Sequence, residues 1–411
     1  MGALTLSRRG AILSGGAALL ASPAFSLKPP LLRTGLDRLL SDRVDLIRGK
    51  RIGLLTHAAG IDRTGARGVD RLAALPGVTL ARLFSPEHGL TGAAAAGEAV
   101  ADGRDAATGL PVQSLYGARR HPDLTGLDAL VIDLQDVGLR CFTYAATMAD
   151  CLKACASAGV EALVLDRPNP LGGLRMEGPL PRPELMSHVA ALPVPLRHGL
   201  TMGELARLAN AALPAPARLT VVAMTGWQRR MGTEVFSAGG LPFARPSPNL
   251  RSAGALLAYP ATVLLEGTNL SEGRGTPAPF ELIGAPWIDA AALAKALNRE
   301  GLDAVRFVPA AFTPDASKYA GQPCQGVRLE RTGLGRYAPL HTGLTLLAVL
   351  HRLYPRDFAV TGGKPPFLDL LMGESRVRTM LMAGENPAAM AGPWSYACER
   401  FRASAQRWLL Y

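Results

Sequence analysis

The sequence predicts an α/β fold in which an open, parallel sheet domain comes first and a smaller domain follows. Between about residues 50 and 225, short runs rich in Val, Ile and Leu alternate with segments of helical periodicity. The apolar runs are continuous rather than alternating, which is typical of strands buried on both faces. A Pro- and Gly-rich stretch at 239–249 then marks a change of pattern. Strands that alternate with helices favour a parallel sheet.

The expected strands of the first domain lie at 51–56, 78–84, 128–134, 160–166 and 219–224. The expected helices between them lie at 66–75, 143–158 and 202–212. Thr201 is placed to cap the last of these helices, and Glu204, three residues on, would complete a capping box.

The part of the chain after the Pro- and Gly-rich stretch is loop-rich as far as about Trp287. Helical patterns follow at 289–299 and 342–353, with short strand-like runs at 304–308 and 325–329. We therefore expect a domain boundary near 240–255. It would separate a first domain at 30–245 from a second at 250–411, after a signal segment at 1–26.

The N-terminus has the pattern of an export signal. The pair Arg8-Arg9 precedes an apolar run at 10–20, and small residues at 21–24 suit a cleavage site. The Ser-Arg-Arg sequence is similar to a twin-arginine signal, and a general secretory signal with two ordinary arginines is the alternative. The run is shorter than the ~20 residues that span a bilayer. We expect a mature protein that is periplasmic or secreted, without stable membrane insertion.

Composition excludes several classes of function. The chain has 44 Lys and Arg against 33 Asp and Glu, for a net charge of +11. The basic residues are dispersed, so nucleic-acid binding is not expected, while an acidic sugar or anionic polymer suits the charge. The 5 cysteines lack zinc spacing and do not form a disulfide framework. No dinucleotide or phosphate loop is present, so we expect no cofactor.

Polar residues gather where three expected strands end, and in an open α/β sheet ligands bind beyond the carboxyl ends of the strands. The clusters are at 85–89, 133–144 and 166–173, with Glu177 beyond. Any one cluster alone could be structural, because an Asp at a strand end often binds loop N–H groups. Three clusters that each follow a strand favour a binding or catalytic site along this edge of the sheet. Loops further on add a second set of polar residues: Arg197, His198, Asn249, Glu266, Asn269 and Arg274.

These segments resemble the NamZ family of exo-β-N-acetylmuramidases, which act on peptidoglycan fragments. The resemblance runs from about residue 35 to the C-terminus. It rests on Ser85-Pro86-Glu87-His88-Gly89, on the run from Asp133 to Arg140, on Asp166-Arg167-Pro168-Asn169-Pro170 with Gly172-Gly173, on Glu177-Gly178-Pro179, and on Glu266-Gly267-Thr268-Asn269 with Arg274-Gly275-Thr276. The chain departs from the family pattern at Thr56-His57-Ala58-Ala59-Gly60, at Ala93–Ala96 and at Cys141.

The resemblance implies a Rossmann-like catalytic domain followed by a smaller α+β ancillary domain, with the sugar between them. It also implies hydrolysis of terminal N-acetylmuramic acid from muramyl glycans in cell-wall turnover or recycling. A non-catalytic peptidoglycan- or muropeptide-binding protein is the alternative. An esterase or amidase is disfavoured because no G-x-S-x-G elbow is present.

Glycoside hydrolysis needs a carboxylic acid that protonates the leaving oxygen and a second group that attacks or activates water. Glu87 is the candidate acid, and His88 is a candidate for proton transfer. The second group stays open among Asp133, Asp136, Glu177, Glu266, Tyr116 and Tyr144.

The lactyl carboxylate of muramic acid calls for a guanidinium group. The candidates for that role are Arg140, Arg167, Arg197 and Arg274. No metal is required: Asp133 and Asp136 could hold a hard cation, but no further acidic spacing supports one. The full substrate-binding set comprises Gln135, Asp136, Arg140, Tyr144, Asp166, Arg167, Asn169, Glu177, Arg197, His198, Asn249, Glu266, Asn269 and Arg274.

Overall fold

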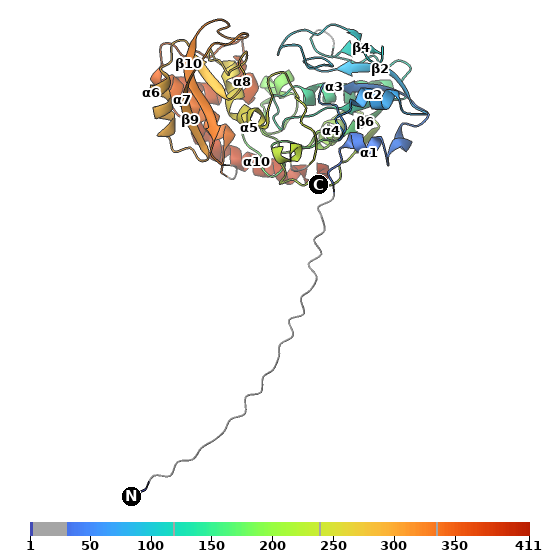
Figure 1. Ribbon diagram of the computed structural model, residues 1–411, viewed down its shortest axis with the longest axis horizontal. Helices are drawn as coiled ribbons and strands as arrows, with labels where there is room; N and C mark the ends of the chain where they lie inside the picture. Colours follow the sequence, from blue (N-terminus) through green and yellow to red (C-terminus); the bar gives the residue numbers. More distant parts are fainter. Residues whose placement is uncertain (3–30, 118–119, 238–239, 334–335) are drawn as a thin grey trace. The chain divides into compact units, whose positions relative to one another are not determined.

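The first part of the chain forms a seven-stranded sheet with the order β3-β4-β2-β1-β5-β6-β7 (Figure 1). All of its pairings are parallel except the short antiparallel contact between β3 and β4. The strands are β1 Arg51–Thr56, β2 Thr79–Ser85, β3 Gly103–Arg104, β4 Pro111–Ser114, β5 Ala129–Asp133, β6 Glu161–Leu165 and β7 Leu219–Val222. The predicted fold class is confirmed, and β3 and β4 are strands that the sequence pattern did not reveal.

This computed structural model describes residues 1–2, 31–117, 120–237, 240–333 and 336–411. Residues 31–411 form one compact unit. The expected signal segment lies outside the described residues, except for Met1 and Gly2. Within the described ranges, no helix has both the length and the apolar character needed to cross a bilayer.

Helices cover both faces of the sheet, which explains why the strands are continuously apolar. On β1, Ile52 and Leu54 pack with the helices α1 Gly35–Leu39 and α2 Gly68–Ala73. Leu55 points to the other face, towards α3 Tyr144–Ala158 and α4 Met202–Ala211. The alternation repeats on β5 and β6, whose apolar residues are divided between the same two clusters.

Helix α4 begins as its sequence predicts. The Thr201 hydroxyl accepts the Glu204 N–H at 3.3 Å, and the Glu204 carboxylate accepts the Thr201 N–H at 3.0 Å, so the capping box is complete. Thr201 also donates to Asp166 at the end of β6, at 2.8 Å. The cap therefore fixes the helix to the sheet as well as satisfying its own first turn.

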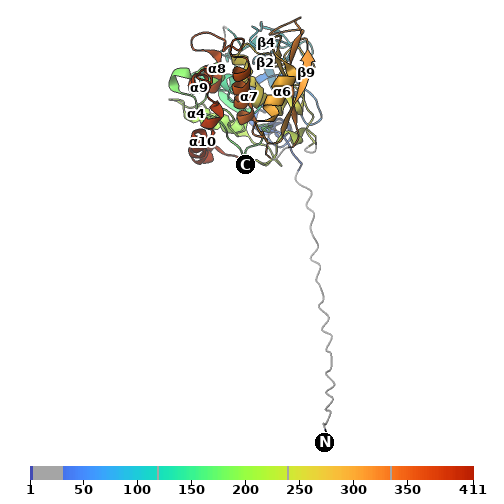
Figure 2. The same ribbon diagram turned by 90° about the vertical axis from the view of Figure 1, so that its left-hand side faces the viewer.

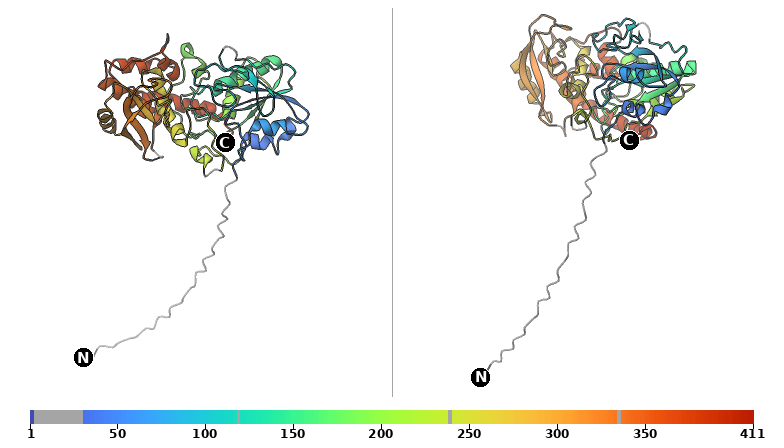
Figure 3. Two further views of the ribbon diagram at one scale, coloured as in Figure 1. Left: turned by 45° about the horizontal axis from the view of Figure 1, so that its top comes forward. Right: turned by 45° about the vertical axis from the view of Figure 1, so that its right-hand side comes forward.

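The second part of the chain contains a three-stranded antiparallel sheet with the order β8-β10-β9. Figure 2 shows α6 between α7 and β9, and Figure 3 shows the orange β9–β10 hairpin in two further views. Elements α6, α7, β9 and β10 match the predicted segments. The elements are α5 Ala253–Thr262, β8 Leu282–Ala285, α6 Ala290–Asn298, β9 Val305–Phe312, β10 Cys324–Arg331, α7 Pro339–Leu353, α8 Phe367–Met372, α9 Arg376–Met382 and α10 Ala391–Ala405.

The two parts of the chain share a hydrophobic core. One apolar cluster runs from Leu55 in the first sheet to Ala405 in the last helix. The C-terminal residues also return to the first sheet, where the Tyr411 hydroxyl donates to the Asp166 carboxylate at 2.7 Å. Short 3₁₀ turns complete the chain: η1 Val44–Leu46, η2 Pro183–Leu185, η3 His188–Ala190, η4 Thr233–Phe236, η5 Val263–Gly267, η6 Pro387–Met390 and η7 Gln406–Trp408.

Candidate active site

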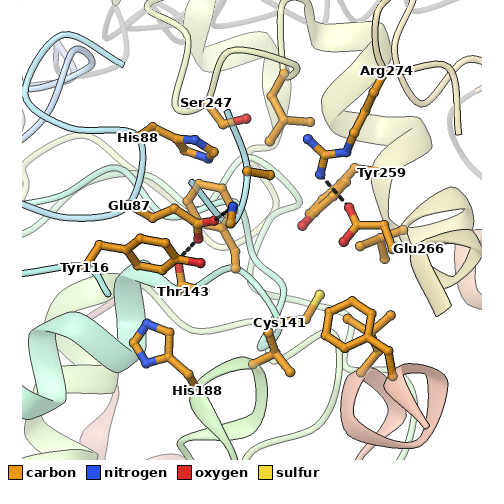
Figure 4. A pocket seen from close by; sticks show the side chains of 18 of the residues that line it. Glu87, His88, Tyr116, Cys141, Thr143, His188, Ser247, Tyr259, Glu266 and Arg274 are labelled. Atoms are coloured by element: carbon orange, nitrogen blue, oxygen red, sulfur yellow. Dashed lines mark hydrogen bonds and ion pairs between the residues drawn. The ribbon is translucent and has the colours of Figure 1, made fainter. Parts of the chain in front are cut away.

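A cavity of about 500 Å³ lies beyond the carboxyl end of β2. Its volume falls within the range of small-molecule sites. Figure 4 shows Glu87 and Tyr116 on one side of it, with Glu266, Arg274 and Tyr259 on the other. The side chains that line it and carry polar groups are Glu87, His88, Tyr116, Arg120, Cys141, Thr143, His188, Ser247, Tyr259, Glu266 and Arg274.

Glu87 reaches the cavity through a sharp turn at the end of β2. His88 and Gly89 both adopt left-handed backbone conformations, with φ of 72° and 75°, and such a φ is uncommon for a residue with a side chain. Glu87 is 8% exposed. Its Oε1 accepts the Gly97 N–H at 2.9 Å and its Oε2 accepts the Thr143 hydroxyl at 2.6 Å. The carboxylate is thus held in one orientation by groups on two other segments.

Tyr116, just beyond β4, lies against the same carboxylate. Burial, followed by the charge of Glu87 and a hydrogen bond to it, raises the pKa of Tyr116 to about 12. The side chain therefore remains a neutral phenol at neutral pH. Its ring centroid lies 6.0 Å from that of His188.

Two histidines line the cavity on the Glu87 side, and both are neutral at pH 7. Burial lowers the pKa of His88, whose Nδ1 lies 2.9 Å from the Ala94 carbonyl. A carbonyl only accepts, so Nδ1 carries the proton and Nε2 is the acceptor nitrogen. Burial also lowers the pKa of His188, with the charge of Arg120 acting in the same direction. Nε2 of His188 is buried and has no hydrogen-bond partner among the described residues.

The opposite wall carries a charged cluster. The Arg274 guanidinium lies 2.5 Å from Glu266 Oε1 and 3.0 Å from Glu272 Oε1, and it stacks at 5.0 Å over the Phe280 ring. Burial raises the pKa of Glu266, and the charge of Glu272 acts in the same direction while Arg274 opposes both. Burial thus favours the neutral form of Glu266, whereas the ion pair with Arg274 favours its charged form.

Five of the sequence-predicted residues come together in this cavity: Glu87, His88, Tyr116, Glu266 and Arg274. The expectation that Asp133 and Arg167 join Glu87 there is corrected by the structure. Both are buried, and Arg167 binds Asp133 through Nε at 2.6 Å and through a terminal nitrogen at 2.8 Å. The two strand ends meet at the same sheet edge, but their charged groups neutralise each other instead of lining the cavity.

Arg140 and Arg197, expected to bind an anionic substrate, are also occupied by protein groups. Arg140 is buried and donates to four backbone carbonyls, those of Pro179, Val194, Leu371 and Met372. Burial lowers its pKa to about 10. Arg197 binds Glu177 at 2.5 Å and the Leu171 carbonyl at 2.6 Å. Arg140 therefore joins the two parts of the chain rather than binding a ligand.

Most of the remaining predicted residues bind other protein groups, and none lines the cavity. Tyr144 illustrates the pattern, because its hydroxyl donates to the Pro246 carbonyl at 2.8 Å and lies 3.3 Å from the Glu87 carbonyl. Tyr144 therefore holds the backbone at Glu87 and Pro246 without lining the cavity. Asn249 lies between the lining residues Ser247 and Leu250 without lining the cavity itself. The others outside the cavity are Gln135, Asp136, Asp166, Asn169, Glu177, His198 and Asn269.

Several lining residues were not predicted. Thr143 stands inside the polar cluster at 133–144, ten residues after Asp133, and its place before a helix was the available signal. Arg120, His188 and Tyr259 stand in segments whose sequence gives no such signal. Among the described residues, no group of three or more His, Cys, Asp or Glu side chains is arranged to hold a metal ion.

Two family models together match most of the chain. The model of the N-terminal region of the exo-β-N-acetylmuramidase NamZ matches residues 52–254, and the model of its C-terminal region matches residues 257–411. The chain belongs to the NamZ family. Glu87 falls in the NamZ N-terminal region, and Glu266 and Arg274 fall in the C-terminal one. Residues of both regions therefore line the cavity.

A curated NamZ relative, the peptidoglycan β-N-acetylmuramidase NamZ of Bacillus subtilis (strain 168), is 43% identical over 389 residues, which cover 93% of this chain and 92% of the relative. Two crystal structures of DUF1343 family proteins from Bacteroides fragilis NCTC 9343 are also similar. The first has a TM-score of 0.84 at 33% identity, and the second a TM-score of 0.72 at 28% identity. Each match covers 92% of this chain and 99% of the solved chain.

Proposed function

We propose that the protein is a glycoside hydrolase, an exo-acting β-N-acetylmuramidase that releases terminal N-acetylmuramic acid from peptidoglycan fragments in cell-wall turnover and recycling. The observation that carries the proposal is the placement of two carboxyl groups, Glu87 and Glu266, on the walls of one cavity in a chain of the NamZ family. Glycosidases commonly use such a pair.

Glu87 is the proposed general acid. Its Oε1 faces the Gly97 N–H, which can only donate, so a proton on this carboxyl group belongs on Oε2. Oε2 contacts the Thr143 hydroxyl, which can rotate to donate or to accept. In the reaction, the Oε2 proton passes to the glycosidic oxygen, which also takes the electron pair of its breaking bond to the muramyl C1.

Glu266 is the proposed second carboxyl group. Of the candidates that the sequence left open for this role, Glu266 and Tyr116 line the cavity. The raised pKa of Tyr116 keeps it a phenol, which makes it a poor nucleophile. Glu266 supplies the charge that faces the oxocarbenium-like centre, while the Arg274 guanidinium fixes its orientation. A water molecule completes the reaction: its oxygen bonds to C1, and the proton that it loses passes to Glu87, which regains its acid form.

The Glu87→Gln variant tests this assignment. Turnover of a disaccharide with a terminal N-acetylmuramic acid is expected to fall by ~10²–10⁴-fold, the scale of general acid catalysis. The loss is expected to be smaller with 4-nitrophenyl N-acetylmuramide, because nitrophenolate leaves without a proton. Released muramic acid is measured by mass spectrometry and nitrophenolate by absorbance.

Glu98→Gln is the matched control, since Glu98 lies on the same loop and is exposed. A folded Glu87→Gln enzyme that cleaves the disaccharide at the normal rate would remove Glu87 from the mechanism. If the unmodified protein binds both compounds and hydrolyses neither, it is a muropeptide-binding protein instead.

We further propose that the protein is exported by the twin-arginine route and works in the periplasm or outside the cell. The support is the pair Arg8-Arg9 before the apolar run at 10–20. Replacing both arginines by lysine is expected to leave the precursor in the cytoplasm. Immunoblots of cell fractions measure this, and unchanged export of the double-lysine variant would favour the general secretory route.

A further inference from the structure

The cavity is lined by two arginines, and their surroundings differ. Arg274 is bound by two carboxylates, Glu266 and Glu272, at 2.5 and 3.0 Å. Its positive charge is already compensated within the protein. Arg120 is exposed at the edge of the cavity, and among the described residues its guanidinium has no hydrogen bond or ion pair.

Arg120 lies on the Glu87 side of the cavity. Its charge favours a lower pKa for both Tyr116 and His188, which line that wall. Nε2 of His188 is a buried polar atom with no partner among the described residues, and buried polar groups rarely remain without one. An uncompensated cation and an unsatisfied imidazole nitrogen thus lie on the same wall of the cavity.

We propose that Arg120 binds the carboxylate of the lactyl ether, the substituent that distinguishes N-acetylmuramic acid from N-acetylglucosamine. This assignment rests on the proposed muramidase function and makes Arg120 a specificity residue. In this role Arg120 takes the place of the four arginines expected from the sequence. Carboxylates or carbonyls of the protein itself bind each of those four, which are Arg140, Arg167, Arg197 and Arg274.

The contribution of Arg120 has a recognisable kinetic form. The lactyl carboxylate does not react, so its contact with Arg120 is the same in the ground state and in the transition state. Such uniform binding changes KM and leaves kcat unchanged. Because Arg120 is exposed, salt screens its attraction for an anion.

The experiment compares 4-nitrophenyl N-acetylmuramide with the same compound in which the lactyl group is a neutral methyl amide. For the unmodified protein, KM is expected to be ~10–100-fold lower for the acid than for the amide, the scale of a hydrogen bond to a charged group. Arg120→Gln is expected to make the two KM values equal while kcat is retained. It should also abolish the rise of KM with ionic strength, and Arg120→Lys should restore part of the preference for the acid.

Arg251→Gln is the matched control, because it removes an exposed positive charge outside the cavity lining. An Arg120→Gln protein that keeps the preference for the acid overturns the inference. So does one whose KM rises equally for both compounds, which indicates a merely structural role. If the unmodified protein hydrolyses neither compound, the muramidase proposal itself fails.

Discussion

His57, the residue after β1, is buried where a charge would be costly. Its Nε2 accepts the Gln135 N–H at 3.0 Å, and its ring meets the edge of Tyr144 at 4.7 Å. Burial lowers its pKa to about 3, with the charges of Arg167 and His88 acting in the same direction. A proton on Nε2 would remove the hydrogen bond to Gln135 and add a second cation beside Arg167.

This pKa predicts a pH dependence of folding stability. The unfolded chain takes up a proton on His57 near pH 6.5, whereas the folded chain does so only near pH 3. The unfolded state therefore binds more protons between these values. The stability linked to His57 is fully present above pH 6.5 and is lost as the pH falls towards 3. The expected slope is about 1.4 kcal/mol per pH unit.

His57→Gln is expected to remove this part of the slope, because an amide oxygen can still accept the Gln135 N–H and does not titrate. The measurement is the free energy of unfolding in urea between pH 4 and 6.5 for both proteins. His121→Gln, at an exposed position, controls for the loss of a histidine side chain. Parallel slopes for the His57→Gln and unmodified proteins would contradict the prediction.

The residue scale also shows where sequence reasoning on the site succeeds and fails. Glu87 was predictable because it lies two residues after the end of β2, and the carboxyl ends of parallel strands gather at one sheet edge. The role expected for Asp133 was wrong because its partner Arg167 stands 34 positions away. Arg140 was misassigned for the same reason, since two of the carbonyls that accept its hydrogen bonds belong to the distant residues Leu371 and Met372. The sequence shows which chemical groups a side chain carries, but it does not show which distant protein groups bind that side chain in the fold.

At the scale of elements, a segment was predictable when its signal was local. The central residues of strands β1, β5 and β6 are apolar because helices cover both faces of these strands. The start of α4 was predictable because both partners of its capping box, Thr201 and Glu204, are three residues apart. Each of these signals lies within a few residues of the element that it specifies.

The elements that escaped prediction depend on distant contacts. Strand β3 has 2 residues and pairs only with β4, so no periodicity can reveal it. Helix α8 packs against η5 and η3, and η3 lies more than a hundred residues before it in the sequence. Arg120 and His188 were missed for the same reason, since each reaches the cavity from a loop or short turn rather than from a strand end.

At the scale of the whole molecule, the cavity needs both parts of the chain. Glu87, Tyr116 and Arg120 come from loops of the first sheet, and Glu266 and Arg274 from the segment after α5. The two parts are joined by the apolar cluster that spans Leu55 to Ala405 and by the four bonds of Arg140. The relative position of the two walls is therefore fixed by core packing as well as by surface contacts.

This shared core predicts that the two parts unfold together. Trp227 packs on Tyr411 against the first sheet, at 5.0 Å, whereas Trp287 packs on Tyr354 in the second part, at 5.3 Å. Variants that keep only Trp227 or only Trp287, with the other tryptophans replaced by Phe, report on each part by fluorescence. Their urea midpoints are expected to coincide with each other and with the loss of far-ultraviolet circular dichroism, as cooperative unfolding requires.

N-acetylmuramic acid supplies the control for this prediction. A ligand that binds the native state alone stabilises it by mass action, and one held between the two walls must raise both midpoints by the same amount. Two separate midpoints, or a ligand shift in one reporter only, would contradict the prediction. Either result would mean that each part folds by itself and that Arg140 and the common apolar cluster contribute too little to couple Glu87 to Glu266.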